Sequence, residues 1–209
     1  LLGRPVIDLE FLVRGVMRNE KKLDTQRVIQ SPVPLSAIAT DAATGQPVVL
    51  RDFTSGDDLL DALWASANMP IVAGPPRPHR TMQLFDALLS EPIPVKTAIE
   101  EGCTHLMVLL TRPVGYVARG VSWLERHALV PKLRAISAPL GDIYIGRGAE
   151  YAQLLNWMDC GNCPVPLALV RPRGAEVSQL ECSEDTLMAG ASSGISAIMT
   201  TFGCKGVTA

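Results

Sequence analysis

The stretch from Thr81 to Leu110 constrains the fold of this chain more than any other. It begins with a short apolar segment, Thr81–Phe85, and ends with the continuous apolar run Leu106–Leu110. Between them, Pro94 suits the first position of an amphipathic helix, and Gly102 suits the position after its last turn. A continuous apolar run is typical of a strand that is covered on both faces. The stretch therefore predicts a strand–helix–strand unit with a parallel pair of strands.

Asp86 follows the first of these predicted strands directly. Reactive groups and ligands gather at the carboxyl ends of the strands in sheets of parallel strands. The pattern therefore places Asp86 where a functional side chain is expected, and makes it the leading candidate for a site residue.

The remaining elements indicate an α/β fold. Asp8 and Ser55 precede apolar residues at helical spacing, so each is expected to cap a helix. The segment 74–78 is too rich in proline for regular structure and is expected to be a loop. We expect one α/β domain over residues 1–209, with a mixed or mostly parallel sheet between helices. Further strands are expected at Pro34–Thr40, Gln46–Leu50 (as a hairpin) and Pro164–Arg171, and further helices at Tyr116–Leu129, Tyr144–Met158 and Thr186–Thr200.

Composition restricts the classes of function. Hydrophobic residues make up 47% of the chain and charged residues 19%, as in a folded domain. A net charge of −2 argues against a nucleic-acid partner, which normally requires a basic surface. The sequence shows no apolar run of membrane-spanning length and no signal-peptide pattern, so a cytoplasmic or peripheral-membrane location is expected. Five cysteines, an odd count, favour a reducing compartment over a disulfide scaffold.

Three motif segments lie in order between Pro32 and Pro113. The first, Ile38–Gly45, reads A-T-D-x-x-T-G; the second, Ala65–Pro70, reads A-S-x-x-x-P; in the third, Asp86-Ala87 precedes Pro92-Ile93-Pro94. Their order and spacing resemble the C-terminal part of a patatin-like phospholipase domain of the bacterial type. In that family the third motif reads D-G-[GA].

The resemblance implies a serine–aspartate dyad. A serine in G-x-S-x-G attacks an ester carbonyl, and the aspartate of D-G-[GA] accepts the serine proton. Asp86 occupies the aspartate position, while Ala87 replaces the glycine that follows it, which is unstrained only where φ is negative. The implied function is hydrolysis of phospholipids or other acyl lipids, with transient membrane-surface contact and without a metal or organic cofactor. The resemblance does not indicate an oligomeric state.

The nucleophile is the missing part of this dyad. The residues before Asp86 contain neither G-x-S-x-G nor a glycine-rich oxyanion loop. We therefore expect residues 1–209 to be the C-terminal portion of one patatin-like hydrolase domain, truncated at the N-terminus and inactive alone. The alternative is a non-catalytic pseudoenzyme, or a lipid-binding or scaffolding domain that retains the fold.

Gly190-Ala191-Ser192-Ser193-Gly194 matches G-x-S-x-G but comes after Asp86. A nucleophile elbow needs an apolar strand that leads into the turn. The preceding residues, Glu181–Thr186, are polar and resemble a helix start. We therefore interpret Ser192 as a residue within a helix, and a self-contained hydrolase that uses Ser192 as the less favoured hypothesis.

Other candidates have simpler explanations. Cys160-Gly161-Asn162-Cys163 follows a predicted helix, not a strand, so incidental thiols in a turn are favoured over a redox or zinc site, with a lone disulfide left open. Asp41 is expected to bond its own turn, and Glu91 to sit at a helix start instead of acting as a second acid.

The histidines and one basic segment complete the candidates. His79 lies in the segment just before the Asp86 strand, and a role at the mouth of the site is the less favoured hypothesis for it; His105 is interpreted as structural and His127 as solvated. The basic segment Pro75–Arg80 is interpreted as a solvated loop, with contact to lipid headgroups as the alternative.

Overall fold

The computed structural model describes residues 5–174, 177–178 and 181–203 of the 209-residue chain. Residues 1–4 and Cys204, the last of the five cysteines, lie outside the described residues. The chain divides into two compact units: Leu1–Pro94 with Arg119–Tyr151, and Val95–Ala118 with Ala152–Ala209. The expectation that residues 1–209 belong to one patatin-like domain stays a prediction. No helix among the described residues is both long and apolar enough to cross a membrane.

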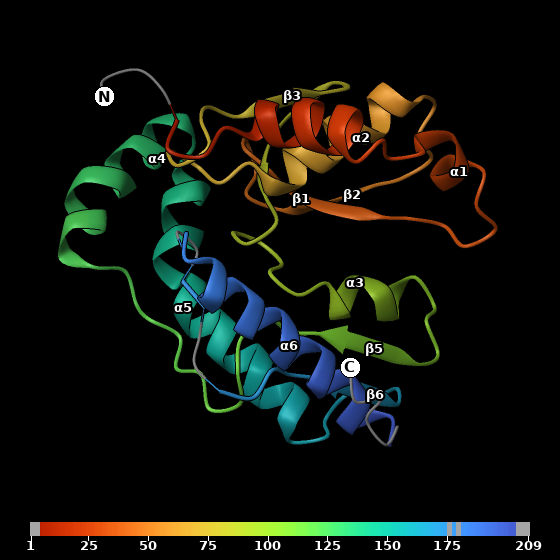
Figure 1. Cartoon of the computed structure of the whole chain (residues 1–209). Helices are drawn as coiled ribbons and strands as arrows, with labels where there is room; N and C mark the ends of the chain where they lie inside the picture. The colour runs from red at the N-terminus through yellow and green to blue at the C-terminus, as the bar shows by residue number, and fades with distance from the viewer. Residues whose placement is uncertain (1–4, 175–176, 179–180, 204–209) are drawn as a thin grey trace. The chain divides into compact units, whose positions relative to one another are not determined.

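The first unit contains a four-stranded antiparallel sheet of strand order β2-β1-β4-β3. Strands β1, β2 and β3 are labelled in Figure 1. The predicted hairpin is confirmed, with Ala39 opposite Val48. The expectation that 74–78 is a loop is wrong for 77–78, which lie in β3 and pair with β4. Pro78, which has no backbone N–H, is tolerated there because β3 is an edge strand. The strands are β1 (Ala37–Asp41), β2 (Pro47–Leu50), β3 (Arg77–His79) and β4 (Met82–Asp86).

Helix α2 (Gly56–Ala67) packs against β1, β3 and β4 of this sheet. Its N-cap is Ser55, as predicted, whose hydroxyl oxygen accepts a hydrogen bond of 3.1 Å from the Asp58 backbone N–H. The buried face of the helix and the facing side of the sheet form one apolar core, which removes a large area of apolar surface from water. This core comprises Ala37, Ala39, Leu50, Phe53, Leu59, Ala62, Ala65 and Leu84.

The N-terminal helical segment of the first unit begins after Asp8, whose carboxylate accepts a hydrogen bond of 2.9 Å from the Phe11 N–H. This cap was predicted from the sequence. The segment η1 (Phe11–Glu20) is π-helical, so its residues do not follow the spacing of an α-helix. Of the apolar residues at helical spacing after Asp8, Leu9 and Val13 are buried, whereas Leu12 is 43% exposed. The short helix α1 (Thr25–Ile29) follows.

Three helical segments complete the first unit: η2 (Glu125–Leu129), α4 (Val130–Ile136) and α5 (Ala138–Asp159), whose last residues belong to the second unit. The predicted helix over Tyr116–Leu129 is wrong for 116–122, which are not helical; Val117, Gly120 and Val121 have low helix propensity. A second core of the first unit joins these helices to the end of β4. It comprises Ala42, Phe85, Leu89, Val130, Leu133, Leu140 and Tyr144.

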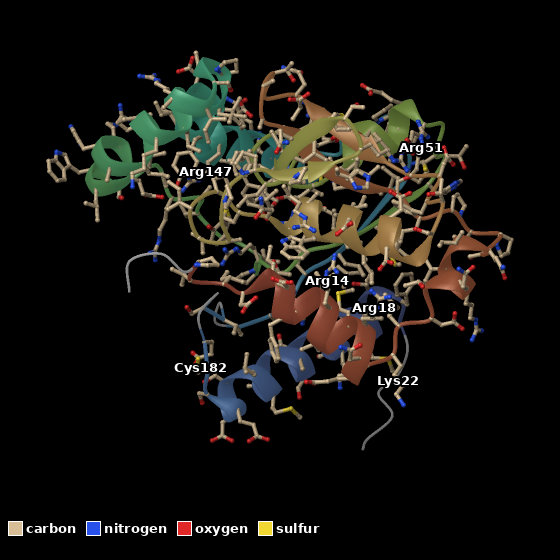
Figure 2. The ribbon with its side chains drawn as sticks, turned by 90° about the horizontal axis from the view of Figure 1, so that it is seen from above. Arg14, Arg18, Lys22, Arg51, Arg147 and Cys182 are labelled. Atoms are coloured by element: carbon tan, nitrogen blue, oxygen red, sulfur yellow. The ribbon has the colours of Figure 1, made fainter. Side chains whose placement is uncertain are left out.

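A polar network fastens η2 to α5. Glu125 Oε1 accepts hydrogen bonds from the Tyr144 hydroxyl at 2.7 Å and from Arg147 at 2.8 Å. The guanidinium of Arg147, labelled in Figure 2, also lies 3.6 Å from the centre of the Tyr144 ring. Burial would raise the pKa of Glu125, but these hydrogen bonds, with those from Ser122, lower it to about 2. The network therefore depends on an ionised Glu125.

The second unit contains a parallel pair of strands, β5 (Leu106–Leu109) and β6 (Leu167–Val170). The predicted parallel pairing of the strand before Asp86 with the strand at 106–110 is wrong, because β4 pairs with β1 and β3 and β5 pairs with β6. An apolar run predicts a strand, but it does not identify the strand with which it pairs. Helix α3 (Val95–Glu100) contacts β5, and α6 (Glu184–Thr201) contacts β6.

The sequence predicted that the strand at 106–110 would be covered on both faces, but β5 is not. Val108 is buried, but Met107 is 57% exposed and Leu109 is 60% exposed, so one face of the strand is open in the described residues. The start of α3 directly after Pro94 and the left-handed conformation of Gly102, with φ of 88°, agree with the sequence. The α/β class is confirmed for the described chain, with an antiparallel sheet in one unit and a small parallel sheet in the other.

Candidate functional site

The three motif segments of the sequence meet at Asp86, the last residue of β4. The Thr40 hydroxyl, from the first motif, donates a hydrogen bond of 2.8 Å to the backbone oxygen of Asp86. The backbone N–H of Asp86 donates to the backbone oxygen of Asn68, from the second motif, at 3.0 Å. The antiparallel pairing of β1 with β4 and the end of α2 therefore hold the backbone of Asp86 from two sides.

Asn68 connects the end of α2 to the strand that carries Asp86. Its side chain is buried, and the amide donates to the backbone oxygens of Pro75 at 2.8 Å and Leu84 at 3.5 Å. A buried amide needs such partners to offset its lost hydration. The sequence motif contained Asn68, but no pattern in the sequence indicated that its side chain would bond to the backbone of Pro75 and Leu84.

The Asp86 carboxyl group is half-buried and has one hydrogen bond among the described residues. Its Oδ1 accepts from the Leu88 N–H at 2.7 Å, and no described cation pairs with it. Burial raises the pKa of Asp86, and the hydrogen bond from Leu88 opposes this shift. A carboxylate with a raised pKa is a stronger base than an exposed one, so this group is suited to accept a proton.

Ala87 fits the backbone beside Asp86 without strain. Among the described residues other than glycine, positive φ occurs only at Lys22, Asp52, Ile71 and Arg80. Because φ at Ala87 is negative, alanine in place of the family's glycine carries no left-handed penalty. The Ala87 N–H donates to the Ser66 backbone oxygen at 3.4 Å, a further contact to the second motif.

Ser90 is linked to this site through Thr40, since its Oγ lies 2.8 Å from Thr40 Oγ1. That contact ties Ser90 to the backbone anchor of Asp86. No hydrogen bond joins Ser90 to the Asp86 carboxyl group among the described residues. Glu91, considered as a second acid, is buried beside it, with 7% of its surface exposed.

Asp41 serves its own turn, as predicted. Its Oδ1 accepts hydrogen bonds from the backbone N–H groups of Ala43 at 2.7 Å and Thr44 at 3.3 Å. These bonds close the turn between β1 and β2. The carboxylate of the A-T-D motif is therefore structural, whereas the preceding Thr40 contacts Asp86.

His79 does not line an open mouth, which excludes the less favoured hypothesis for this residue. It is 4% exposed in β3, and its Nε2 lies 3.6 Å from Asp58 Oδ1 of α2. Burial lowers the pKa of His79, against the opposing effect of Asp58. His105 is exposed before β5, while the Nδ1 of the exposed His127 lies 2.8 Å from the Trp123 backbone oxygen.

The two arginines of the basic segment pair with acids of α2. Arg77 lies over the Trp64 ring at 3.7 Å and bonds to Asp61 at 2.8 Å. Arg80 bonds to Asp58 at 3.1 Å. The positive charges of this segment are therefore paired with acids of α2. The segment contains an edge strand, so the interpretation as a solvated loop is wrong.

The interpretation of Gly190–Gly194 is confirmed. The segment lies within α6, which is capped by Ser183, and Ser192 is exposed on it with no strand leading into the motif. Ser193 instead exchanges hydrogen bonds with the backbone of Arg173: its Oγ accepts from the N–H at 3.1 Å and donates to the carbonyl oxygen at 2.5 Å.

Cys160 and Cys163 are free thiols in the turn after α5. Across the described residues, no group of three or more histidine, cysteine, aspartate or glutamate side chains is placed to hold a metal ion. The interpretation of these cysteines as incidental thiols stays a prediction.

No model of a known protein family matches this chain, and no curated protein matches it at a significant level. Support for a function therefore comes from two sources, the motif order in the sequence and the hydrogen bonds that join Thr40, Asn68 and Asp86.

Proposed function

We propose that Asp86 is the proton acceptor of a serine–aspartate lipid acyl hydrolase of the patatin-like type. The observation that carries this proposal is the convergence of three motif segments on one half-buried aspartate. Thr40 and Asn68 hold its backbone, while the carboxyl group keeps an oxygen without a hydrogen-bond partner among the described residues. Acyl lipids or phospholipids are the proposed substrates, and contact with a membrane surface is proposed to be transient.

The proposed chemistry has two steps. In the first, a serine hydroxyl attacks the ester carbonyl while Asp86 accepts its proton; the tetrahedral adduct then expels the alcohol, which takes that proton, and an acyl-serine remains. In the second, Asp86 accepts a proton from water as the water attacks the acyl-serine. Collapse of this adduct returns the proton to the serine and releases the carboxylic acid.

The proposal requires a serine that the described residues do not supply. Ser90 contacts Thr40 and not the Asp86 carboxyl group, and Ser192 lies within α6. We therefore propose that the dyad serine belongs to protein sequence beyond these 209 residues, in a strand–G-x-S-x-G–helix arrangement.

The test uses the protein expressed from its whole reading frame. Hydrolysis of p-nitrophenyl butanoate and of phosphatidylcholine vesicles is measured for the wild type and for Asp86→Asn. Loss of the proton acceptor is expected to lower kcat/KM by about 100- to 10,000-fold. The matched control is Asp142→Asn, because Asp142 is an exposed acid that pairs with Arg134 at the surface. Activity that survives Asp86→Asn would overturn the assignment.

A fluorophosphonate probe identifies the nucleophile independently. Such probes label activated serines covalently, and the labelled peptide is located by mass spectrometry. Labelling of a serine in an upstream G-x-S-x-G supports the proposal. Labelling of Ser192 would instead support the self-contained hydrolase, and absence of both labelling and hydrolysis would support the non-catalytic alternative.

A further inference from the structure

Two large apolar side chains, Trp123 and Leu124, lie next to each other on the surface of the first unit, directly before η2. Trp123 is 73% exposed and Leu124 is 68% exposed, and Trp123 is the most exposed aromatic side chain among the described residues. Adjoining apolar side chains on a surface indicate contact with another protein or with a membrane. The pair is therefore the apolar part of a candidate docking surface.

His127 restricts the ring of Trp123. The two ring centres lie 4.5 Å apart, and His127 Nδ1 lies 2.8 Å from the Trp123 backbone oxygen, which can only accept a hydrogen bond. A side chain that is already restricted loses less conformational entropy when it binds. An indole has an apolar body and a polar N–H, so it suits the boundary between hydrocarbon and water, where tryptophan is enriched in membrane proteins.

The exposed charges around this pair are positive. The segment 119–137 contains one acid, Glu125, whose carboxylate is bonded to α5 in the network described above. Arg119, Arg126 and Lys132 are exposed, and none of their side chains has a hydrogen bond or ion pair with a described residue. Cations without an acidic partner attract an anionic surface. The segment therefore combines exposed apolar side chains with available positive charge.

The other side of the same helical segment belongs to the core beside Asp86. Val130 and Leu133 are buried in one apolar core with Phe85 and Leu89, which come before and after Asp86 in the chain. All of these residues belong to the first unit. A surface that binds the exposed side would therefore hold the Asp86 turn at a fixed distance from it.

We propose that the exposed side of residues 123–132 docks the protein on an anionic phospholipid surface. Trp123 and Leu124 enter the interface between headgroups and hydrocarbon, while Arg126 and Lys132 contact the headgroups. Helices that lie in a membrane interface combine tryptophan or leucine with arginine and lysine in this way, whereas the centres of protein–protein interfaces are depleted in lysine. The inference deepens the proposed function and rests on it, since a hydrolase of phospholipids has to approach the surface that carries them.

Vesicles of ether-linked phospholipids test the docking without any hydrolysis, because these lipids have no carboxylic ester. The protein expressed from its whole reading frame is sedimented with vesicles of phosphatidylcholine alone, or of equal parts phosphatidylcholine and phosphatidylglycerol. Binding to the mixed, anionic vesicles is expected to be at least about tenfold tighter, since each cation near such a surface contributes about fivefold. Absence of binding to the anionic vesicles, or equal binding to both, would overturn the proposal.

Variants locate the contact on this surface, and melting curves establish that each variant is folded. Trp123→Ala combined with Leu124→Ala is expected to weaken binding to the anionic vesicles at least about tenfold, because both apolar side chains are removed from the interface. Arg126→Gln and Lys132→Gln are each expected to weaken it about fivefold. Unchanged binding in the folded double variant would overturn the proposal.

The matched controls lie elsewhere in the first unit. Phe11 is an exposed aromatic residue of η1, and Arg27 is an exposed cation of α1, which Figure 1 shows at the opposite end of the unit from α4. Phe11→Ala and Arg27→Gln should each leave vesicle binding unchanged. Equal losses in control and test variants would show that binding does not depend on residues 123–132, and would overturn the proposal.

Tryptophan fluorescence reports the contact of Trp123 itself, one of three tryptophans in the chain. Addition of anionic vesicles should shift the emission to shorter wavelength and protect it from acrylamide. Trp123→Phe keeps an aromatic side chain, so it should still bind while it loses this fluorescence change. A change that persists in Trp123→Phe would place the contact elsewhere and overturn the proposal.

Two further outcomes distinguish this inference from its alternatives. Self-association that disappears in the double variant, without vesicle binding, would identify a second copy of the chain as the occupant and overturn the proposal. Failure of vesicle binding would leave the effect of Asp86→Asn on the soluble ester unaltered, so it would refute the docking and not the proposed function. Vesicle binding with no hydrolysis would instead support the docking and refute the proposed function.

Discussion

The hydroxyl of Thr40 and the backbone oxygen of Asp86 are joined by a hydrogen bond of 2.8 Å. Thr40 is fully buried in β1, and the antiparallel pairing of β1 with β4 places it opposite Phe85, the residue before Asp86. The same hydroxyl lies 2.8 Å from the Ser90 hydroxyl. One threonine therefore contacts both ends of the turn Asp86–Ser90, the backbone at Asp86 and the side chain at Ser90.

Replacement of Thr40 tests this anchor. Thr40→Val keeps the shape of the side chain but leaves the Asp86 carbonyl and the Ser90 hydroxyl short of a partner, so it should lower the free energy of unfolding by about 1–3 kcal/mol. Urea unfolding measures the change. Thr44→Val, at an exposed position of the same hairpin, should alter stability by about 0.5 kcal/mol or less. Equal effects of the two variants would contradict the anchoring role.

Replacement of Asp86 should reveal the cost of its burial. The pKa of Asp86 is raised in the folded state, mainly by burial, so the folded chain disfavours the ionised form. The free energy of unfolding should therefore fall as pH rises from the unfolded value of 3.8 through the raised folded pKa. Asp86→Asn retains the acceptor for Leu88 without the charge, so it should remove this pH step and increase stability at pH 7.

Urea unfolding between pH 3 and pH 7 measures this step, with Asp142→Asn as the control at an exposed carboxylate. A lower stability of Asp86→Asn at pH 7 would mean that the folded chain stabilises the charge. The proposed hydrolysis should show the complementary dependence, since its rate should rise with pH as Asp86 ionises. Gain of stability with loss of activity is characteristic of catalytic groups.

The local structure was largely readable from the sequence. The caps at Asp8 and Ser55, the hairpin at β1 and β2, and the helix after Pro94 all depend on residues close together in the chain. Strand pairing depends on distant segments, and apolar runs do not encode a partner. The parallel pair was therefore assigned to the wrong strands, although one segment of that pair, at β5, does form a parallel ladder.

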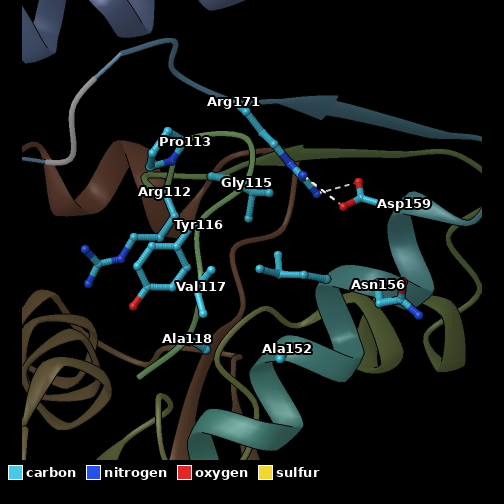
Figure 3. A pocket seen from close by; sticks show the side chains of 12 residues that line it. Arg112, Pro113, Gly115, Tyr116, Val117, Ala118, Ala152, Asn156, Asp159 and Arg171 are labelled. Carbon is cyan, nitrogen blue, oxygen red and sulfur yellow. Dashed lines mark hydrogen bonds and ion pairs between the residues drawn. The ribbon is translucent and has the colours of Figure 1, made fainter. Parts of the chain in front are cut away.

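The sequence motifs included the residues of the candidate site but did not predict the hydrogen bonds between them. The motifs singled out Asp86, and the A-T-D and A-S-x-x-x-P segments included Thr40 and Asn68. Their contacts with Asp86 require β1 to pair with β4 and α2 to end beside that strand, neither of which a local pattern contains. The ion pair between Arg171 and Asp159 (Figure 3) could not be predicted from a local pattern either, because it joins the residue after β6 to the end of α5.

The Glu125 network should make the first unit sensitive to acid. The hydrogen bonds from Tyr144 and Arg147 outweigh burial and lower the pKa of Glu125 from 4.5 to about 2. Its contribution to stability is then complete above pH 4.5 and is lost as pH falls toward about 2, by on the order of 2 kcal/mol for a partly exposed pair. Glu125→Gln should abolish this loss, whereas Glu150→Gln, at an exposed position of α5, should retain it.

Acid titration of the unfolding free energy, followed by circular dichroism in urea, measures the difference between these variants. The comparison is made between pH 5.5 and pH 2.5, which spans about the window of the shifted pKa. A wild-type curve parallel to that of Glu125→Gln would show that Glu125 is not stabilised in its ionised form.

Ser192 and Ser193 occupy the same G-x-S-x-G match, but removal of the hydroxyl should destabilise the fold only at Ser193. Ser193 Oγ bonds to both the N–H and the carbonyl oxygen of Arg173, so Ser193→Ala should lower the free energy of unfolding by about 1 kcal/mol. Ser192 is exposed on α6, and alanine has the higher helix propensity, so Ser192→Ala should change stability by less than about 0.5 kcal/mol. Hydrolysis by the whole protein should also be unchanged in Ser192→Ala. Because the two substitutions are chemically identical and adjacent, a loss of activity confined to Ser192→Ala would identify Ser192 as the nucleophile and would refute the structural interpretation of this motif.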